Sequence, residues 1–276
     1  MLKTGVVGLG MIGGGVAVCL AREGLLEAVY DVRPDAAEAL EGVPSCLPSL
    51  KALGKSCNIV IIAVVDADQV RAALSGPDGL LAESEEGLII ILQSTVSLPD
   101  LKDISALAAK SGAIVVDCGV TGGMAAASNG LVSLVGADDE TYARAEPVLK
   151  AYSKDVVHMG GFGAGMAAKI ARNVIVYNIW RAGYEGALLA EAAGVDIKKL
   201  AEAINTSDEG VAGPTTWMTR ETEPSEDPQE KGLREHVFTM LHKDLGAALD
   251  LAGTVGVELP MTELSQASGK TMLRID

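Results

Sequence analysis

The chain has 276 residues, of which 49% are hydrophobic and 21% charged, so it holds enough apolar material for a folded core of one large or two smaller domains. Its 22 basic and 37 acidic side chains give a net charge of -15, which disfavours nucleic acid and anionic lipid as partners. No apolar run reaches the roughly 18 residues of a membrane span, and the spacing of the four cysteines fits neither a zinc site nor a disulfide framework. We therefore expect a cytoplasmic protein with no membrane partner and with reduced thiols.

Over the first 160 residues, short β-rich runs alternate with helical or turn-rich segments, which is typical of βαβ units. Several of the runs are apolar throughout, as strands covered on both faces require. The candidate strands are residues 3–8, 27–31, 58–64, 88–92, 114–117, 132–135 and 156–158. This pattern predicts an α/β fold in which residues 1–162 form a Rossmann-type, doubly wound parallel sheet.

The periodicity changes after residue 163. Residues 164–193 contain no proline and carry apolar residues three and four apart, which predicts a long linking helix. Gly194 is suited to cap its end, and Asp196 to open the next helix. A polar loop is expected over residues 221–235, followed by helices over 238–254 and from Pro260 to the end. Residues 163–276 are thus predicted to form an all-helical domain.

A glycine-rich turn follows the first predicted strand and opens a helix. Residues 8–13 read Gly-Leu-Gly-Met-Ile-Gly. In this context Gly8 makes the tight turn, Gly10 lets the backbone approach a pyrophosphate, and Gly13 lets the helix pack on the strand. Met11 and Ile12 begin the predicted helix, and the partial positive charge at a helix N-terminus favours phosphate binding. A glycine-rich turn without any nucleotide is the alternative interpretation.

Asp31 ends the second predicted strand, 18 residues after Gly13. A carboxylate at this point can accept hydrogen bonds from both ribose hydroxyls and repels a 2′-phosphate, which favours NAD over NADP. Arg33 can stack on adenine or reach a 2′-phosphate, so NADP remains possible. Val32, beside the acid, and Val64 and Val65, after the third strand, complete the predicted cofactor site.

Two later clusters place anion-binding groups together. Residues 117–123 read Asp-Cys-Gly-Val-Thr-Gly-Gly, and Thr121, Gly122 and Gly123 offer a hydroxyl and unobstructed N–H groups to a carboxylate. Lys169 and Asn173 are four residues apart on the long helix and so share one face. The alternative is a solvated surface lysine beside ordinary turns. Together the clusters predict a site for a small carboxylate substrate.

These motifs resemble the β-hydroxyacid dehydrogenases, which include 3-hydroxyisobutyrate dehydrogenase and tartronate semialdehyde reductase, along essentially the whole chain. The resemblance rests on residues 8–13, residues 117–123, the helix with Lys169 and Asn173, and Lys243-Asp244-Leu245. It implies that Thr95, after the strand at 88–92, and Lys243 contact the cofactor. It also implies an NAD(P)-dependent enzyme that forms a homodimer or homotetramer, with NAD(P) bound by residues 1–162 and with substrate and dimerisation contacts in residues 163–276.

The implied reaction moves a hydride between nicotinamide and the hydroxyl or aldehyde carbon of a small β-hydroxy acid or its semialdehyde. Lys169 would act as the proton shuttle and Asn173 would orient the oxygen. An imine or ketone reductase on the same architecture is one alternative, although imine reductases generally carry aspartate or tyrosine at the lysine position. A non-catalytic NAD-binding scaffold is the other.

The chain departs from the family pattern in its substrate loop and its helix. The loop usually reads Asp-Ala-Pro-Val-Ser-Gly-Gly, whereas this chain has Cys118, Gly119 and Thr121 at the changed positions, and Arg172 replaces the first of two asparagines. These changes leave the preferred substrate open. The histidines at 158, 236 and 242 are scattered, so we expect no metal. Trp217 and Phe238 are candidate pocket walls, although core packing is the more frequent role of such residues.

Overall fold

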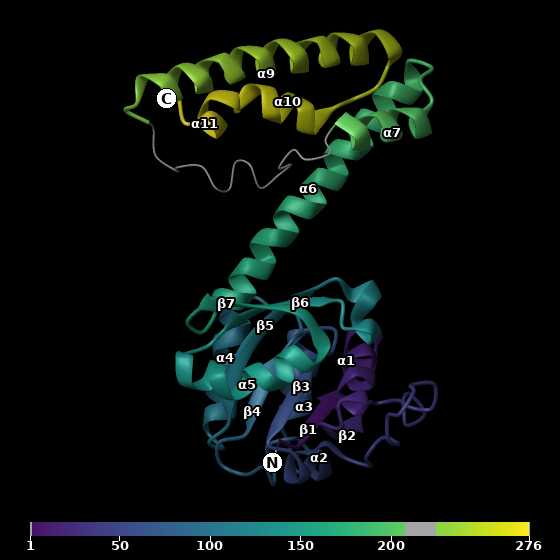
Figure 1. The fold of residues 1–276 in the computed structure, drawn as a ribbon, viewed down its shortest axis with the longest axis vertical. Helices are drawn as coiled ribbons and strands as arrows, with labels where there is room; N and C mark the ends of the chain where they lie inside the picture. The colour runs from purple at the N-terminus through teal and green to yellow at the C-terminus, as the bar shows by residue number, and fades with distance from the viewer. Residues whose placement is uncertain (1, 208–224, 276) are drawn as a thin grey trace. The chain divides into compact units, whose positions relative to one another are not determined.

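The computed structural model describes residues 2–207 and 225–275, and the chain divides into two compact units, Met1–Arg172 and Asn173–Asp276 (Figure 1). The first unit contains all the described strands, together with the start of helix α6. The predicted fold class, a Rossmann-type sheet followed by a helical region, is confirmed.

The first unit is built on a seven-stranded sheet with the order β2-β1-β3-β4-β5-β6-β7. Its strands are β1 (Thr4–Val7), β2 (Leu26–Tyr30), β3 (Ile59–Ile62), β4 (Ile89–Leu92), β5 (Ile114–Thr121), β6 (Leu131–Gly136) and β7 (Ser153–Gly160). All neighbouring strands are parallel except β5 and β6, which pair antiparallel from Asp117 opposite Gly136 to Thr121 opposite Val132. The predicted parallel sheet is therefore present, with one antiparallel pair that the sequence did not indicate.

The antiparallel pair follows from the length of its connection. Strand β5 continues to Thr121, four residues beyond its predicted end, so only residues 122–130 separate it from β6. They contain the short helix η1 (Gly123–Ser128). A parallel crossover needs a dozen or more residues, whereas this short connection allows the chain to turn back beside β5.

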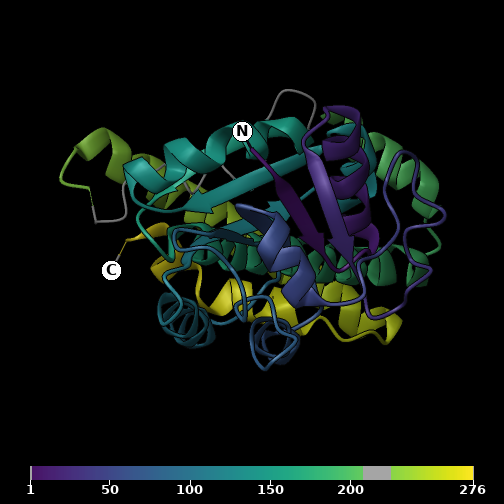
Figure 2. The same ribbon diagram turned by 90° about the horizontal axis from the view of Figure 1, so that it is seen from below.

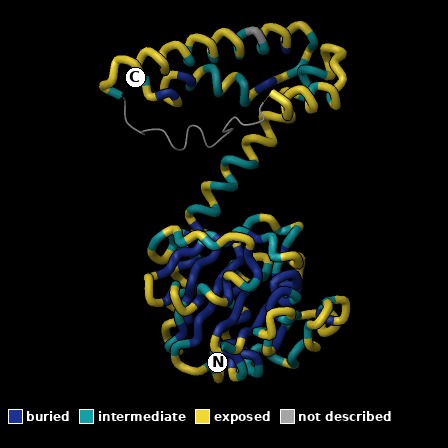
Figure 3. Tube along the Cα trace, in the orientation of Figure 1, coloured by how far each residue is buried: buried dark blue, intermediate teal, exposed yellow. Residues whose placement is uncertain are grey.

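Helices cover both faces of the sheet and bury two hydrophobic cores (Figures 2 and 3). Helices α1 (Met11–Arg22) and α5 (Asp139–Tyr152) pack on one face, and α2 (Leu50–Ser56), α3 (Ala67–Leu74) and α4 (Leu98–Ala109) on the other. The central strands β3 and β4 are apolar and buried at every residue, as this double cover requires.

Local sequence fixes where several helices begin. A serine or aspartate at the N-cap accepts a hydrogen bond from a backbone N–H in the first turn of α2, α3, α4, α5 and α9. The capping residues are Ser49, Asp66, Ser97, Asp138 and Asp227. The last of these corrects a prediction: the polar loop expected up to residue 235 ends at Asp227, because Asp227 and Pro228 start α9 (Pro228–Val255) about ten residues earlier than predicted.

In the second unit the described elements are all helical. Helix α6 (Ala164–Ala192) begins in the first unit, and Gly194, two residues after its end, has a φ of +78° that suits the predicted cap. It is followed by α7 (Ile197–Ser207), α9, α10 (Pro260–Ala267) and α11 (Gly269–Leu273), and the last two pack on α9. Glu185, which is 1% exposed, holds the start of α10 by accepting hydrogen bonds from the backbone N–H groups of Met261 and Thr262.

Candidate active site

The glycine turn lies at the carboxyl end of β1. Strand β1 has β2 on one side and β3 on the other, so the order of the strands in the sheet changes direction at this point. Gly8 has a φ of +86°, and a Cβ there would lie 2.6 Å from the carbonyl oxygen of Ala63. A Cβ at Gly13 would overlap the carbonyl oxygen of Gly8, so α1 packs against the turn only because residue 13 is glycine. Gly10, in contrast, faces open space within 4 Å. The turn therefore has the shape that a pyrophosphate requires at a helix N-terminus.

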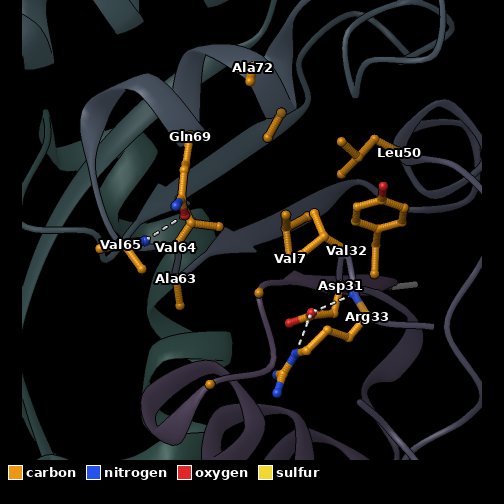
Figure 4. Close-up of a pocket in the computed structure, with 14 residues that line it drawn as sticks. Val7, Asp31, Val32, Arg33, Leu50, Ala63, Val64, Val65, Gln69 and Ala72 are labelled. Carbon is orange, nitrogen blue, oxygen red and sulfur yellow. Dashed lines mark hydrogen bonds and ion pairs between the residues drawn. The ribbon is translucent and has the colours of Figure 1, made fainter. Parts of the chain in front are cut away.

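A pocket of about 570 Å³ opens beside this turn (Figure 4). It is lined by residues from the ends of β1, β2 and β3 and from helices α2 and α3. Seven of them were predicted cofactor residues, namely Gly8, Gly10, Asp31, Val32, Arg33, Val64 and Val65. Sequence reasoning missed the other seven lining residues, because no local motif marks them: Val7, Tyr30, Leu50, Ala63, Gln69, Ala72 and Ala73. The position and size of the pocket fit the adenosine half of a dinucleotide.

Asp31 is the acidic group at the edge of the pocket. Its side chain is 8% exposed, and its carboxylate accepts hydrogen bonds from Leu9 N at 2.7 Å and Arg33 N at 2.9 Å. Arg33 Nε lies 3.2 Å from the same carboxylate (Figure 4). Burial alone raises the Asp31 pKa, but these hydrogen bonds and the guanidinium charge outweigh it, so the pKa is below its usual value. The group is thus ionised at neutral pH, and Arg33 is held against it.

The loop after β3 is held by two side chains. Ser94, at the end of β4 and 4% exposed, accepts a hydrogen bond from Val64 N at 3.0 Å and donates one to Val64 O at 2.8 Å. Gln69 Oε1 accepts from Val65 N at 3.1 Å (Figure 4). Ser94 therefore fixes a wall residue of the pocket through both of its backbone groups. Thr95, predicted to contact the cofactor, is the exposed residue that follows.

Asp117 has a structural role at the start of α6. It is fully buried in β5, and its two carboxylate oxygens accept hydrogen bonds from Gly163 N at 2.6 Å and Met166 N at 2.7 Å. Burial raises its pKa, while the backbone hydrogen bonds act in the opposite direction. Asp117, predicted as the first residue of the substrate loop, thus caps the helix that carries Lys169.

Lys169 lies on α6 with its stem against β5. A Cβ at Gly119 would overlap Lys169 Cβ and lie 3.0 Å from Lys169 Cγ. Lys169 is half-buried, and this burial is the main reason why its pKa is lowered from the usual lysine value. The positive charge of Arg172 lowers the Lys169 pKa further. Strand β5 ends at Thr121, two residues after Gly119.

The glycines after Thr121 lie against the cofactor helix. Gly122 has a φ of +86°, and a Cβ at Gly123 would lie 2.8 Å from Ile12 Cδ1 and 3.8 Å from Met11 Sδ. The predicted substrate loop is therefore in contact, at Gly123, with the first residues of α1. Within the first unit, the structure brings the cofactor turn, this loop and the strand beneath Lys169 together.

The other predicted site residues lie in the second unit. Asn173 is half-buried in α6, four residues after Lys169. Lys243 is exposed on α9 and pairs with Asp244 at 3.1 Å. Phe238, also on α9, lies beside His242 and Lys270, and Trp217 is outside the described residues. The roles assigned to these residues stay predictions.

Within residues 2–207 and 225–275, no three His, Cys, Asp or Glu side chains gather as a metal site would need. None of the described helices combines the length and apolarity of a bilayer crossing.

Two family models match the chain in sequence. Residues 3–161 match the NAD binding domain of 6-phosphogluconate dehydrogenase, and residues 163–274 match the NAD-binding domain of NADP-dependent 3-hydroxyisobutyrate dehydrogenase. Together with the glycine turn and its pocket, these matches define a nicotinamide-dependent oxidoreductase.

Individual proteins give the same assignment. The 2-(hydroxymethyl)glutarate dehydrogenase of Eubacterium barkeri is 30% identical over 96% of this chain and 87% of its own length. The structure of Mycobacterium tuberculosis 3-hydroxyisobutyrate dehydrogenase with L-serine is 27% identical, with a TM-score of 0.68 over 98% of this chain and 94% of that one. The chain belongs to the β-hydroxyacid dehydrogenase family.

An imine reductase from Pseudomonas sp. shares the architecture. Its TM-score is 0.76 over 98% of this chain and 92% of that one, at 20% identity. At this identity the likeness shows the fold alone.

Proposed function

We propose that the protein oxidises a small β-hydroxy acid, or reduces the corresponding semialdehyde, with NAD preferred over NADP. The observation that carries the proposal is the packing of the Lys169 stem on Gly119 in β5. It brings a lysine to the strand whose end, Thr121, begins the glycine loop that contacts the cofactor helix. Its relatives named for hydroxy acids support the same substrate class.

The cofactor, when bound, supplies the hydride acceptor for oxidation and the hydride donor for reduction. Gly8, Gly10 and Gly13 would hold its pyrophosphate at the start of α1, and Asp31 its adenine ribose. The ionised Asp31 carboxylate disfavours a 2′-phosphate at this edge of the pocket, and Arg33 is already engaged by it. Both observations support NAD. We also propose that Val32, Val64, Val65 and Thr95 contribute cofactor contacts.

Lys169 would move the proton that accompanies the reaction. As an amine it accepts the hydroxyl proton of the substrate in oxidation, and as an ammonium it donates a proton to the carbonyl oxygen in reduction. The lowered pKa makes the amine available at lower pH than for a free lysine. Asn173 would orient the same oxygen, and Lys243 would add positive charge near the cofactor against the net charge of -15.

Thr121, Gly122 and Gly123 would hold the substrate carboxylate. The Thr121 hydroxyl and the N–H groups of the two glycines provide donors without large side chains in the way. Because a carboxylate fixed here leaves the β-carbon of the substrate free, the loop selects the carbon that reacts. Thr121 keeps the hydroxyl of the serine in the family pattern and adds a methyl group beside it.

The proposal is tested by turnover of the purified protein with NAD or NADP at alkaline pH. The substrate panel contains 3-hydroxyisobutyrate, 3-hydroxypropionate, glycerate, serine and 4-hydroxybutyrate. We expect NAD reduction with at least one of the β-hydroxy acids and little with 4-hydroxybutyrate, whose hydroxyl lies one carbon further from the carboxylate. Activity confined to cyclic imines or ketones would favour the reductase alternative, and NAD binding without any turnover would favour the scaffold.

We further propose a homodimer or homotetramer. Helix α6 exposes several large apolar side chains, including Val174 at 58% and Trp180 at 65% exposed. Such a surface is unusual for a monomer in water and is typical of subunit contacts. Light scattering that gives the mass of a single chain would contradict this proposal.

A further inference from the structure

Gly119 is the residue of β5 that faces the stem of Lys169. Its backbone shows no left-handed φ, so an L-residue is compatible with its conformation. Space is the constraint: a Cβ would overlap Lys169 Cβ and lie 3.0 Å from Lys169 Cγ and 3.1 Å from Gly165 O. The absence of a side chain at this position allows Lys169 to lie directly on the strand.

A rotamer change of Lys169 cannot relieve this overlap. The atom that would be met first is the Cβ of the lysine, which is fixed to the backbone of α6, rather than the flexible end of the side chain. The helix is in turn held on the sheet by the two hydrogen bonds from Gly163 N and Met166 N to Asp117. Gly165 packs so closely that its own Cβ would lie 2.7 Å from Gly136 N. Any side chain at 119 must therefore shift the helix, the strand or both.

We propose that Gly119 is a positioning residue that sets where the Lys169 amine lies relative to the loop at Thr121, Gly122 and Gly123. The inference rests on the proposed function, because it assigns the placement of the proton shuttle to this glycine. Carbon atoms in ordinary contact are about 3.5 to 4.0 Å apart, so a methyl group at 119 that overlaps Lys169 Cβ must displace the lysine by at least about 1 Å. A shift of this size at a reacting group lowers the rate about a hundredfold.

The test compares Gly119→Ala with Gly161→Ala. Gly161 lies just before α6, has no heavy atom within 4 Å of the position that a Cβ would take, and lacks a left-handed φ. The same methyl group is thus added with and without the overlap. For each variant, kcat, the KM values for NAD and substrate, and the pH profile are measured on the hydroxy acid that the wild type turns over.

We expect kcat of Gly119→Ala to fall about a hundredfold while KM for NAD stays within about twofold, because the pocket at Asp31 is unchanged. The pH at which oxidation becomes fast should move upward, since a lysine displaced toward water loses part of the burial that lowers its pKa. Gly161→Ala should behave like the wild type. Equal kcat and equal pH profiles in Gly119→Ala and the wild type would overturn the inference.

A second measurement covers the case that Gly119→Ala is too unstable to assay. Thermal unfolding of Gly119→Ala, Lys169→Gly and the double variant gives the coupling between the two positions. We expect the loss in melting temperature caused by Gly119→Ala to shrink in the Lys169→Gly background, and an undiminished loss would refute the contact. A wild type that reduces no NAD with any hydroxy acid would instead contradict the proposed function, so the two failures are distinguishable.

Discussion

The exchange Asp31→Ala tests how the cofactor is chosen. The proposal assigns the carboxylate two hydrogen bonds from the adenine ribose, and bonds to a charged acceptor contribute about 1.5 to 3 kcal/mol each. A loss of about 3 kcal/mol corresponds to roughly a hundredfold decrease in kcat/KM for NAD. The exchange also frees Arg33, whose Nε lies 3.2 Å from the carboxylate in the wild type, to meet a 2′-phosphate.

The assay is the ratio of kcat/KM for NAD to that for NADP with one substrate. We expect the ratio to fall at least a hundredfold, and to fall further when Val32→Arg is added, because Val32 is 86% exposed beside the pocket. Asp35→Ala is the matched control, since Asp35 is an exposed acid in the same segment that does not line the pocket. A ratio in Asp31→Ala within about threefold of the wild type would refute the reasoning and show that another group selects the cofactor.

Three further predictions concern the groups around the site. Asp117→Ala removes the acceptor for the N–H groups of Gly163 and Met166, each of which costs about 1 to 3 kcal/mol when left without a partner. Urea unfolding should therefore show a decrease of about 4 kcal/mol in the free energy of unfolding, and a smaller decrease for Asp117→Asn. A decrease below about 1 kcal/mol would contradict the capping role. Ser94→Ala should weaken NAD binding about tenfold, because Val64 loses both of its hydrogen bonds to the Ser94 hydroxyl. Affinity is measured by titration with NAD, and kcat should stay within about twofold of the wild type. An unchanged affinity would show that Val64 is held in place without Ser94. The rate of oxidation should rise with pH, because the amine form of Lys169 is needed, and it should level off below the usual pKa range of lysine, because burial lowers the Lys169 pKa. The rate of reduction should fall over the same pH range. An oxidation rate that does not change from neutral to alkaline pH would contradict the role of Lys169 as the proton shuttle.

The cofactor turn could be predicted from the sequence because all of its determinants are local. Gly8, Gly10 and Gly13 stand next to a strand and a helix in the chain. Gly8 and Gly13 have the conformation or close contact that their positions require, and Gly10 leaves the open space that a pyrophosphate needs. Asp31 was predictable for the same reason, as the acid directly after a strand. The long helix was predictable from its apolar periodicity and from Gly194 at its end.

Features that depend on distant contacts could not be predicted in this way. Glycine is rare within strands, so the sequence around Gly119 indicates a loop, yet the structure places Gly119 within β5. The reason lies 50 residues later in the chain, at Lys169, whose side-chain stem occupies the space that a Cβ at 119 would need. Asp117 caps the start of α6 by accepting a hydrogen bond from Gly163, which lies 46 residues later, and no pattern near Asp117 indicates it. The start of α9, in contrast, has a local signal in Asp227 and Pro228, which an interpretation of prolines as loop residues overlooked.

The most direct test of the central claim, that Lys169 carries the proton transfer of a hydroxy acid dehydrogenase, is NAD reduction by Lys169→Ala and Lys169→Met. The methionine variant keeps an unbranched stem against Gly119 and removes only the amine. We predict that both variants lose at least about a thousandfold in turnover while binding NAD within about twofold of the wild type. Near-normal turnover in either variant would contradict the account.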